Sequence, residues 1–173
     1  SKKTVVSPVA VPGALAYQQA DAKFRGRKGS RDIKVVVAML KEAVTADYPP
    51  ALNLLGEIYL YGDLPGSDPR PSIELFRRGA EMGNPTAAFN LGECFYYGMA
   101  GLSRDYGQAV KCYYRALDLG SPQASYALGR CYDRGHGLIR DHSKALQMYQ
   151  QAADGNYAPA RDVLALEKDN SGK

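Results

Sequence analysis

The sequence repeats itself with a period of 36 to 37 residues. The dipeptide Leu-Gly recurs at residues 55–56, 91–92 and 128–129. A second glycine follows each dipeptide at the same interval, at Gly62, Gly98 and Gly135. A shared register over this period is typical of a helix-turn-helix unit that is copied along a chain. The period therefore restricts the fold to stacked helical hairpins more strongly than any other feature of the sequence.

Each copy has the pattern of two helices. Apolar residues recur at i, i+3, i+4 and i+7 in the third copy, at Ala109, Cys112, Tyr113 and Ala116, and this is the period of a helix. Asn-Pro at 84–85 and Ser-Pro at 121–122 supply an N-cap followed by proline at the first helical position. An aspartate also precedes each of three expected second helices, at Asp32, Asp105 and Asp141. The sequence predicts an all-α protein.

The register also divides the chain. Residues 1–13 contain Pro8 and Pro12 and predict an extended arm, and the repeat region then spans 14–167. The expected repeats are 14–48, 49–84, 85–121 and 122–157, followed by a capping helix at 158–167 and a polar tail at 168–173. One helical hairpin cannot bury its apolar face alone, so the four repeats should stack into an elongated α-solenoid.

Composition limits the setting of this solenoid. The chain is 45% hydrophobic, which is enough to bury the core of one domain. It holds no apolar run near the roughly 20 residues that a membrane-spanning helix needs. Three cysteines form no C-x-x-C pair, and their odd number would leave one thiol unpaired in an oxidising compartment. We therefore expect an intracellular protein with reduced thiols, in the cytoplasm or in an organelle.

The repeated segments resemble a known family. They read ALNLLGEIYLYG at 51–62, AAFNLGECFYYG at 87–98 and ASYALGRCYDRG at 124–135. This pattern is similar to that of the Sel-one-like repeat, a relative of the tetratricopeptide repeat. The resemblance implies a right-handed superhelix that acts as an adaptor or scaffold in protein complexes. The loop at 63–71 departs from the family pattern, and we expect a different loop conformation there.

No pattern for catalysis, metal binding or a cofactor accompanies the repeats. His136 and His142 are the only histidines, and no set of cysteines or carboxylates with ligand spacing lies beside them. The sequence contains no phosphate-binding loop and no nucleophile-elbow motif. Cys94 and Cys131 occupy equivalent positions where a small buried side chain is expected. We predict a protein that is not an enzyme.

Resemblance to tetratricopeptide packing places the first helix of each repeat on the concave side. Two rows of residues, two before and two after the repeated Leu, should then line a groove, with a rim one turn further along. An acidic row beside aromatic rings would suit an extended protein segment that carries Lys or Arg. The alternative is that the rings pack between layers and the acids are solvated. The predicted groove residues are Tyr17, Asp21, Asn53, Glu57, Tyr61, Phe89, Glu93, Tyr97, Tyr126, Arg130 and Arg134.

Positive charge gathers near the N-terminus. Residues 1–41 hold nine basic and two acidic residues, and the remaining residues hold 13 and 16. Six of the basic residues form a predicted basic patch, namely Lys23, Arg25, Arg27, Lys28, Arg31 and Lys34. The patch is either a solvated loop or a surface for an acidic protein face, acidic lipid or nucleic acid, and without a recognisable nucleic-acid motif an acidic protein is at least as well favoured as RNA. The function alternative to a groove-binding scaffold is a structural subunit of a large assembly, such as a ribonucleoprotein, held by the arm and this patch.

Overall fold

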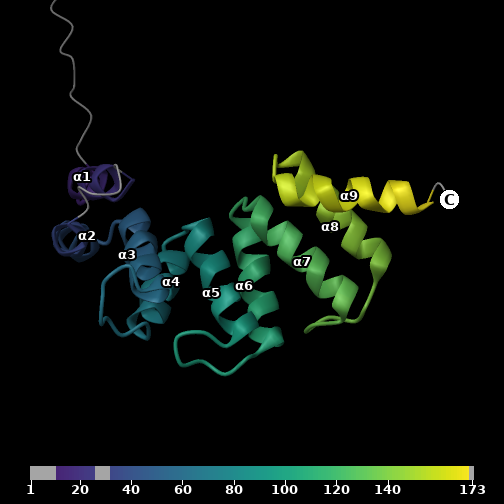
Figure 1. The fold of residues 1–173 in the computed structure, drawn as a ribbon, viewed down its shortest axis with the longest axis horizontal. Helices are drawn as coiled ribbons and strands as arrows, with labels where there is room; N and C mark the ends of the chain where they lie inside the picture. Colours follow the sequence, from purple (N-terminus) through teal and green to yellow (C-terminus); the bar gives the residue numbers. More distant parts are fainter. Residues whose placement is uncertain (1–10, 26–31, 172–173) are drawn as a thin grey trace, which may run out of the picture.

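The computed structural model describes residues 11–25 and 32–171, and within these ranges it consists of α-helices without strands (Figure 1). The helices pair along the chain into four hairpins, and a last helix follows. Their bounds are α1 Ala14–Arg25, α2 Ile33–Thr45, α3 Pro49–Tyr61, α4 Pro71–Glu81, α5 Pro85–Tyr97, α6 Tyr106–Asp118, α7 Pro122–Arg134, α8 His142–Asp154 and α9 Ala158–Ser171. The all-α repeat fold that the sequence predicted is confirmed.

Local sequence signals set the helix ends. The side chains of Asn84 and Ser121 accept hydrogen bonds from the first turns of α5 and α7, each just before a proline. Three first helices end at a glycine in the left-handed conformation, namely Gly62, Gly98 and Gly135. The start of α4 differs, because Arg70 precedes it without a side-chain cap and instead bonds to Asp68, in keeping with the unusual loop expected there.

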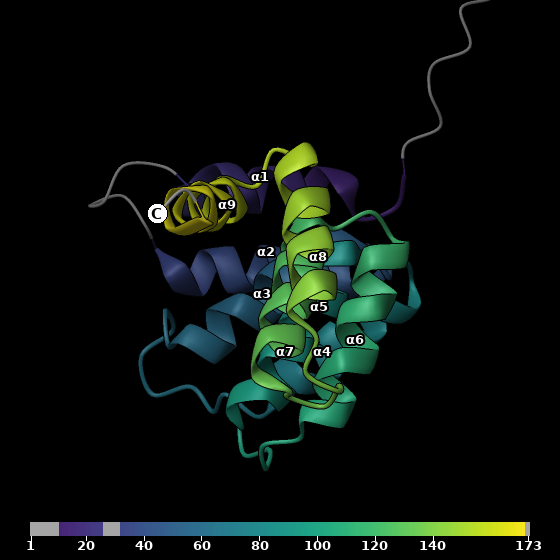
Figure 2. The same cartoon turned by 90° about the vertical axis from the view of Figure 1, so that its right-hand side faces the viewer.

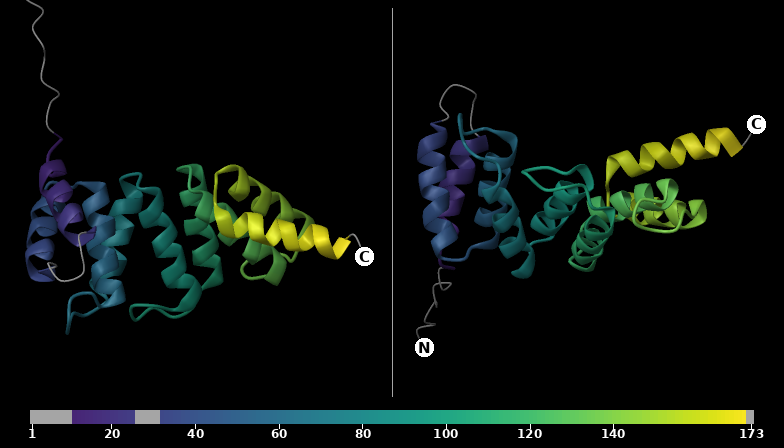
Figure 3. Two further views of the ribbon diagram at one scale, coloured as in Figure 1. Left: turned by 45° about the horizontal axis from the view of Figure 1, so that its top comes forward. Right: turned by 90° about the horizontal axis from the view of Figure 1, so that it is seen from below.

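The helices stack in chain order. Each helix packs on the one before and the one after it, and α1 also contacts α3, as α3 contacts α5. Figure 1 shows the resulting row from α1 at one end to α9 at the other, and in Figure 2 the row is seen from its end, so that successive helices overlap. Figure 3 shows the same elongated stack from two further directions. First helices therefore form one continuous side of the solenoid.

The repeated glycine of each Leu-Gly pair lies against an aromatic ring of the following helix. A Cβ atom added to Gly56 would lie 2.6 Å from the ring of Phe76. The same addition at Gly92 would meet Tyr113 at 2.6 Å, and Gly129 would meet Tyr149 at 2.5 Å. These rings are buried, so the absence of a side chain lets the two helices of each hairpin approach closely.

The last helix is longer than predicted. We expected a capping helix at 158–167, whereas α9 continues to Ser171. Its Ala160 is fully buried, 36 residues after the buried Ala124 of α7, so α9 has the register of another first helix. The extra residues are polar and lack an apolar period, and three of the four are the weak helix formers Asp, Asn and Ser, so neither periodicity nor propensity indicated the extension.

Candidate interaction face

The predicted groove residues come together on one side of the stack. They lie on α1, α3, α5 and α7, the first helices of the four hairpins. We call the surface formed by these eleven residues the first-helix face. Side-chain hydrogen bonds join its members directly between α5 and α7, whereas its members on α3 are joined to α5 through Asn90, which is not one of the eleven.

The centre of the face holds a carboxylate bound by two amides. Asn53 Nδ2 donates to Glu57 Oε1 at 3.0 Å, and Asn90 Nδ2 donates to the same oxygen at 3.0 Å. Asn90 also donates to Asn53 Oδ1 at 2.9 Å. No cation of the described residues forms an ion pair with Glu57. The cluster therefore orients one negative charge between α3 and α5 without neutralising it.

Asn90 was not among the predicted site residues. It lies one position before the repeated Leu91, where the register predicts a side chain that packs inside the solenoid. The structure agrees, since Asn90 is only 7% exposed. Its amide is the one buried polar group that reaches from α5 to α3. A buried polar side chain needs a hydrogen-bond partner. An asparagine at an apolar position of the repeat was the sequence signal for this contact.

The next carboxylate along the face is neutralised internally. Arg130 Nη2 lies 3.2 Å from Glu93 Oε1, with both side chains about four-fifths buried, and Arg130 Nη1 donates to the Tyr97 hydroxyl at 3.0 Å. The Tyr113 hydroxyl of α6 donates to Glu93 as well. Burial works against the charged form of Arg130, but its bonds to Tyr97 and Glu93 prevail and raise its pKa. The Arg130–Glu93 ion pair therefore joins α5 to α7.

Aromatic packing surrounds that joint. The Arg130 guanidinium lies 5.2 Å from the ring centre of Tyr96 and 5.7 Å from that of Tyr126, which is the range of a cation–π contact. Tyr126 packs on Tyr149 and Tyr157 at 5.4 and 5.3 Å between ring centres. These contacts support the alternative that this ring of the predicted row packs between layers.

The remaining predicted residues divide into paired and exposed groups. Asp21 lies 2.6 Å from Arg25 of its own helix, and Tyr17 packs on Tyr48 at 5.3 Å. Phe89 packs on Tyr113, and Arg134 donates to the Tyr96 hydroxyl. Tyr61 and Tyr97, by contrast, are 64% and 46% exposed. The most accessible members of the face are therefore Tyr61, Tyr97 and Arg134, and Glu57 is half-buried.

The basic patch is only partly described. Its members Arg27, Lys28 and Arg31 lie outside the described residues, as does most of the predicted N-terminal arm. Lys23 and Lys34 are exposed, and Arg25 is engaged with Asp21. The described part of the patch thus offers two cations that form no ion pair within 11–25 and 32–171.

The cysteines and histidines have structural surroundings. Cys94 and Cys131 are fully buried, and burial raises their thiol pKa values to about 12 and about 11. His136 stacks on Tyr106 with ring centres 4.1 Å apart, and His142 lies 2.8 Å from Asp133. In the part of the chain that the structure describes, no three ligand-type side chains form a group that could hold a metal ion.

No helix within the described ranges has the length and apolarity to cross a membrane.

Comparison with protein families assigns the repeat. The Sel1 repeat model matches three times, at residues 49–84, 85–121 and 122–157, which together are more than half of the sequence. The chain belongs to the Sel1 repeat family. Proteins of this family generally mediate protein–protein interactions and are typically non-catalytic scaffolds. No curated protein matches the sequence.

Solved structures agree with this assignment. A Sel1 repeat protein from Oxalobacter formigenes is 30% identical, with a TM-score of 0.81 over 92% of this chain and 65% of its own. The protein c5321, a protective antigen of uropathogenic Escherichia coli, is 23% identical, with a TM-score of 0.81 over 93% of this chain and 34% of its own. Immunity protein Pa5087 from Pseudomonas aeruginosa is 21% identical, with a TM-score of 0.65 over 90% of this chain and 58% of its own. The chain spans less than two thirds of each of these proteins.

Proposed function

We propose that this Sel1 repeat chain is a non-catalytic scaffold that binds an extended segment of a partner protein along its first-helix face. The observation that carries the proposal is the Glu57 carboxylate, which two amides orient and which no cation of the described residues neutralises. A lysine or arginine of the partner would complete this cluster with a charge-assisted hydrogen bond.

The surroundings of Glu57 suit such a segment. Tyr61 on α3 and Tyr97 on α5 are exposed rings at the ends of these helices. Partial desolvation of the side chain, followed by the nearby Glu57 carboxylate, raises the pKa of Tyr61. Tyrosine offers a large contact area with a polar tip. The rings would therefore cover the stem of a basic side chain whose charged end reaches Glu57.

The internal ion pairs restrict the proposed binding site to one carboxylate, in place of the continuous acidic row that the sequence predicted. Asp21 and Glu93 already have cationic partners, Arg25 and Arg130, so neither needs a partner's charge. The Glu93–Arg130 pair instead joins α5 to α7, and the Asp21–Arg25 pair lies within α1. A surface that is ordered before binding loses little conformational entropy on binding.

The test is a comparison of partner capture by the wild-type chain and by Glu57→Gln. Glutamine keeps an oxygen that can accept from Asn53 and Asn90, so the substitution removes the charge and leaves the cluster. We expect the partner identified by mass spectrometry to bind the variant about tenfold more weakly, because a charge-assisted hydrogen bond is lost. Glu42→Gln, at an exposed position of α2, is the matched control and should bind as the wild type does.

Two results would contradict the proposal. One is a partner whose affinity is the same for wild type and Glu57→Gln. The other is exclusive capture of a nucleic-acid-containing complex that dissociates at high salt and ignores Glu57, because phosphate contacts weaken steeply with ionic strength. The second result would instead favour an assembly subunit held by the basic patch.

A further inference from the structure

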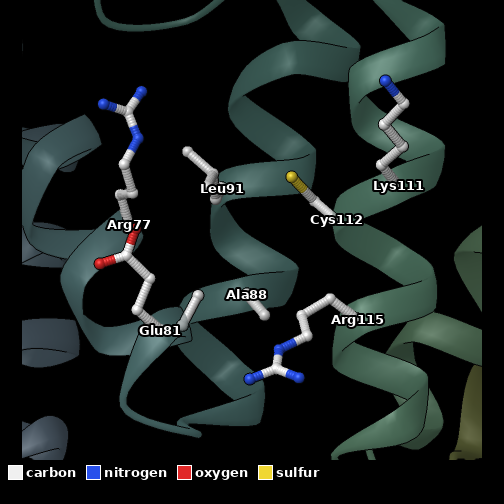
Figure 4. A pocket seen from close by; sticks show the side chains of 8 residues that line it. Arg77, Glu81, Ala88, Leu91, Lys111, Cys112 and Arg115 are labelled. Atoms are coloured by element: carbon white, nitrogen blue, oxygen red, sulfur yellow. The ribbon is translucent and has the colours of Figure 1, made fainter.

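A cavity opens between α4, α5 and α6, away from the first-helix face (Figure 4). Its volume is about 410 Å³, within the range of roughly 300 to 1,000 Å³ that is usual for ligand pockets. We call it the α5 groove. None of its lining residues belongs to the first-helix face. It arises because α4 and α6 pack on α5 from either side, and at its base Ala88 and Leu91 of α5 are 1% and 8% exposed.

The floor of the α5 groove is apolar. It is formed by Ala80 of α4, Ala88 and Leu91 of α5, and Cys112 of α6. In Figure 4 the Cys112 sulfur points toward Leu91 across the middle of the groove. Water in such a site has few polar partners. An apolar side chain placed there would cover the partly buried Cys112, since the fold already buries Ala80, Ala88 and Leu91.

The edge of the groove is basic. Arg77, Lys111 and Arg115 surround the floor, with Glu81 as the one acidic member of the lining. Lys111 and Arg115 are exposed, four residues apart on α6, and form no ion pair within the described residues. Like charges at this spacing destabilise a helix slightly. The fold therefore carries a small cost there that an anion would relieve.

The positive charges also lie close to the floor. Burial raises the pKa of the Cys112 thiol to about 11, while Arg77 and Lys111 act in the opposite direction. Arg77 has one ionic contact, with Glu74 of its own helix at 3.3 Å, and both side chains are at least half exposed. Such exposed pairs contribute little, so the Arg77 guanidinium is available to a stronger acceptor.

The next repeat shows that the packing does not require these charges. The corresponding cleft beside α7 has a volume of about 160 Å³ and no charged residue in its lining. Ser125 takes the place of Ala88, 37 residues later, and Gln151 takes that of Arg115, 36 residues later. The α7 cleft is otherwise lined mainly by Gly120, Ser121, Pro122 and Gly155, so the two clefts overlap only in part in the repeat register, and they differ in volume and in charge.

We propose that the α5 groove docks an acidic, amphipathic segment of a protein partner. One apolar side chain of that segment would occupy the floor, and flanking carboxylates would bind Lys111 and Arg115. Protein is favoured over nucleic acid because no aromatic ring lines the groove, and stacking on such rings supplies much of single-strand binding. The site selects charge opposite to that expected at Glu57, so one solenoid would bind two segments of opposite sign.

The first experiment is a selection from a displayed library of random peptides. Peptides are enriched on the full chain and depleted on the double variant Lys111→Glu with Arg115→Glu, because these two side chains are exposed and form no ion pair within the described residues. The enriched sequences should carry a leucine, phenylalanine or methionine between aspartates or glutamates. Enrichment of basic or uncharged sequences, or failure to enrich any sequence that discriminates against the double variant, would overturn the proposal.

The second experiment measures affinity and position with one selected peptide. Its dissociation constant should rise at least about tenfold with the double variant, as expected for the loss of two charge contacts. Lys41→Glu, at an exposed position of α2, is the matched control and should change it by less than about twofold. Glu57→Gln should have no effect, which separates this site from the function proposed above.

Cys112 reports on the location. It is partly buried in the groove, whereas Cys94 and Cys131 are fully buried, so alkylation of the folded chain should occur at Cys112. Saturating peptide should slow that alkylation, and unchanged alkylation would place the peptide elsewhere. Displacement of the peptide by oligouridylate with equal affinity would assign the groove to nucleic acid and contradict the proposal.

Discussion

At the scale of single residues, the repeated glycines act through the rings that cover them. Gly92 faces the fully buried ring of Tyr113, whose hydroxyl continues to Glu93. Gly129 faces Tyr149, whose hydroxyl donates to Asp133 at 2.8 Å. The glycine thus permits the close packing that brings the hydroxyl to a carboxylate on the helix carrying the glycine. In these two copies the close approach brings a polar contact with it, whereas Gly56 faces Phe76, which has no hydroxyl.

This contact predicts the effect of Gly92→Ala. The new methyl group would displace the Tyr113 ring, and overpacking of this kind costs about 1 to 3 kcal/mol. The better helix propensity of alanine offsets up to about 1 kcal/mol of that loss. We expect a lower free energy of unfolding by denaturant titration, and Thr86→Ala, at an exposed position of the same helix, should change it by less than about 0.5 kcal/mol. Equal stability of both variants would contradict the packing argument.

At the scale of helices, polar contacts of one side chain join successive helices at the C-terminal part of the stack. His142 at the start of α8 lies 2.8 Å from Asp133 of α7 and 3.6 Å from Glu167 of α9. One imidazole therefore touches both of the helices that flank α8. The hydrogen bond to Asp133 is the main cause of the raised pKa of His142. Charge on this ring strengthens the end of the solenoid.

The pH dependence follows from that direction. Because the folded pKa is raised, the contribution of His142 to stability is complete below the unfolded pKa of about 6.5 and is lost as pH rises through the folded pKa. We expect the melting temperature of the wild type to exceed that of His142→Gln in mildly acidic buffer and to approach it in alkaline buffer. Proton NMR of His142 should give a pKa above that of an unfolded reference peptide and a lower value after Asp133→Asn. A difference in melting temperature between wild type and His142→Gln that increases with pH would contradict this prediction.

At the scale of the whole molecule, contacts run between neighbours in the stack. The helix pairs with substantial contact are consecutive, apart from the pairing of α1 with α3 and of α3 with α5. The stability of such a solenoid is approximately a sum over repeats and their interfaces. A substitution in one repeat should therefore destabilise the adjacent repeats, and its effect should decrease with distance along the stack.

Hydrogen exchange would test this locality. Gly129→Ala should raise amide exchange in α7 and α8, where the ring of Tyr149 must move, and in α9, which packs on α8. Exchange in α1 to α3 should remain that of the wild type, because partial unfolding in repeat arrays is local. A uniform increase along the chain would show that the repeats unfold as one cooperative unit.

Much of the fold was predictable from the sequence because its signals are local or periodic. The helical period, the prolines at helix starts and the glycines at their ends act within a few residues of one another. The period of 36 to 37 residues then required stacking, since each hairpin exposes an apolar face until a neighbour covers it. The extension of α9 to Ser171 was missed because polar residues at a chain end carry only a weak propensity signal.

The candidate site was predictable only as a set of positions. The register placed Glu57, Glu93 and Arg130 on equivalent faces of successive first helices, and this depends on sequence alone. Which carboxylate stays unneutralised depends on distances between helices that are 33 to 37 residues apart in sequence. Asn90 and the α5 groove likewise exist only where two or three helices meet. The sequence by itself determined the repeat and the face on which each residue lies, whereas tertiary packing decided which charges are paired. The reason is that Coulomb and hydrogen-bond energies depend on distances of a few ångströms, which periodicity does not specify.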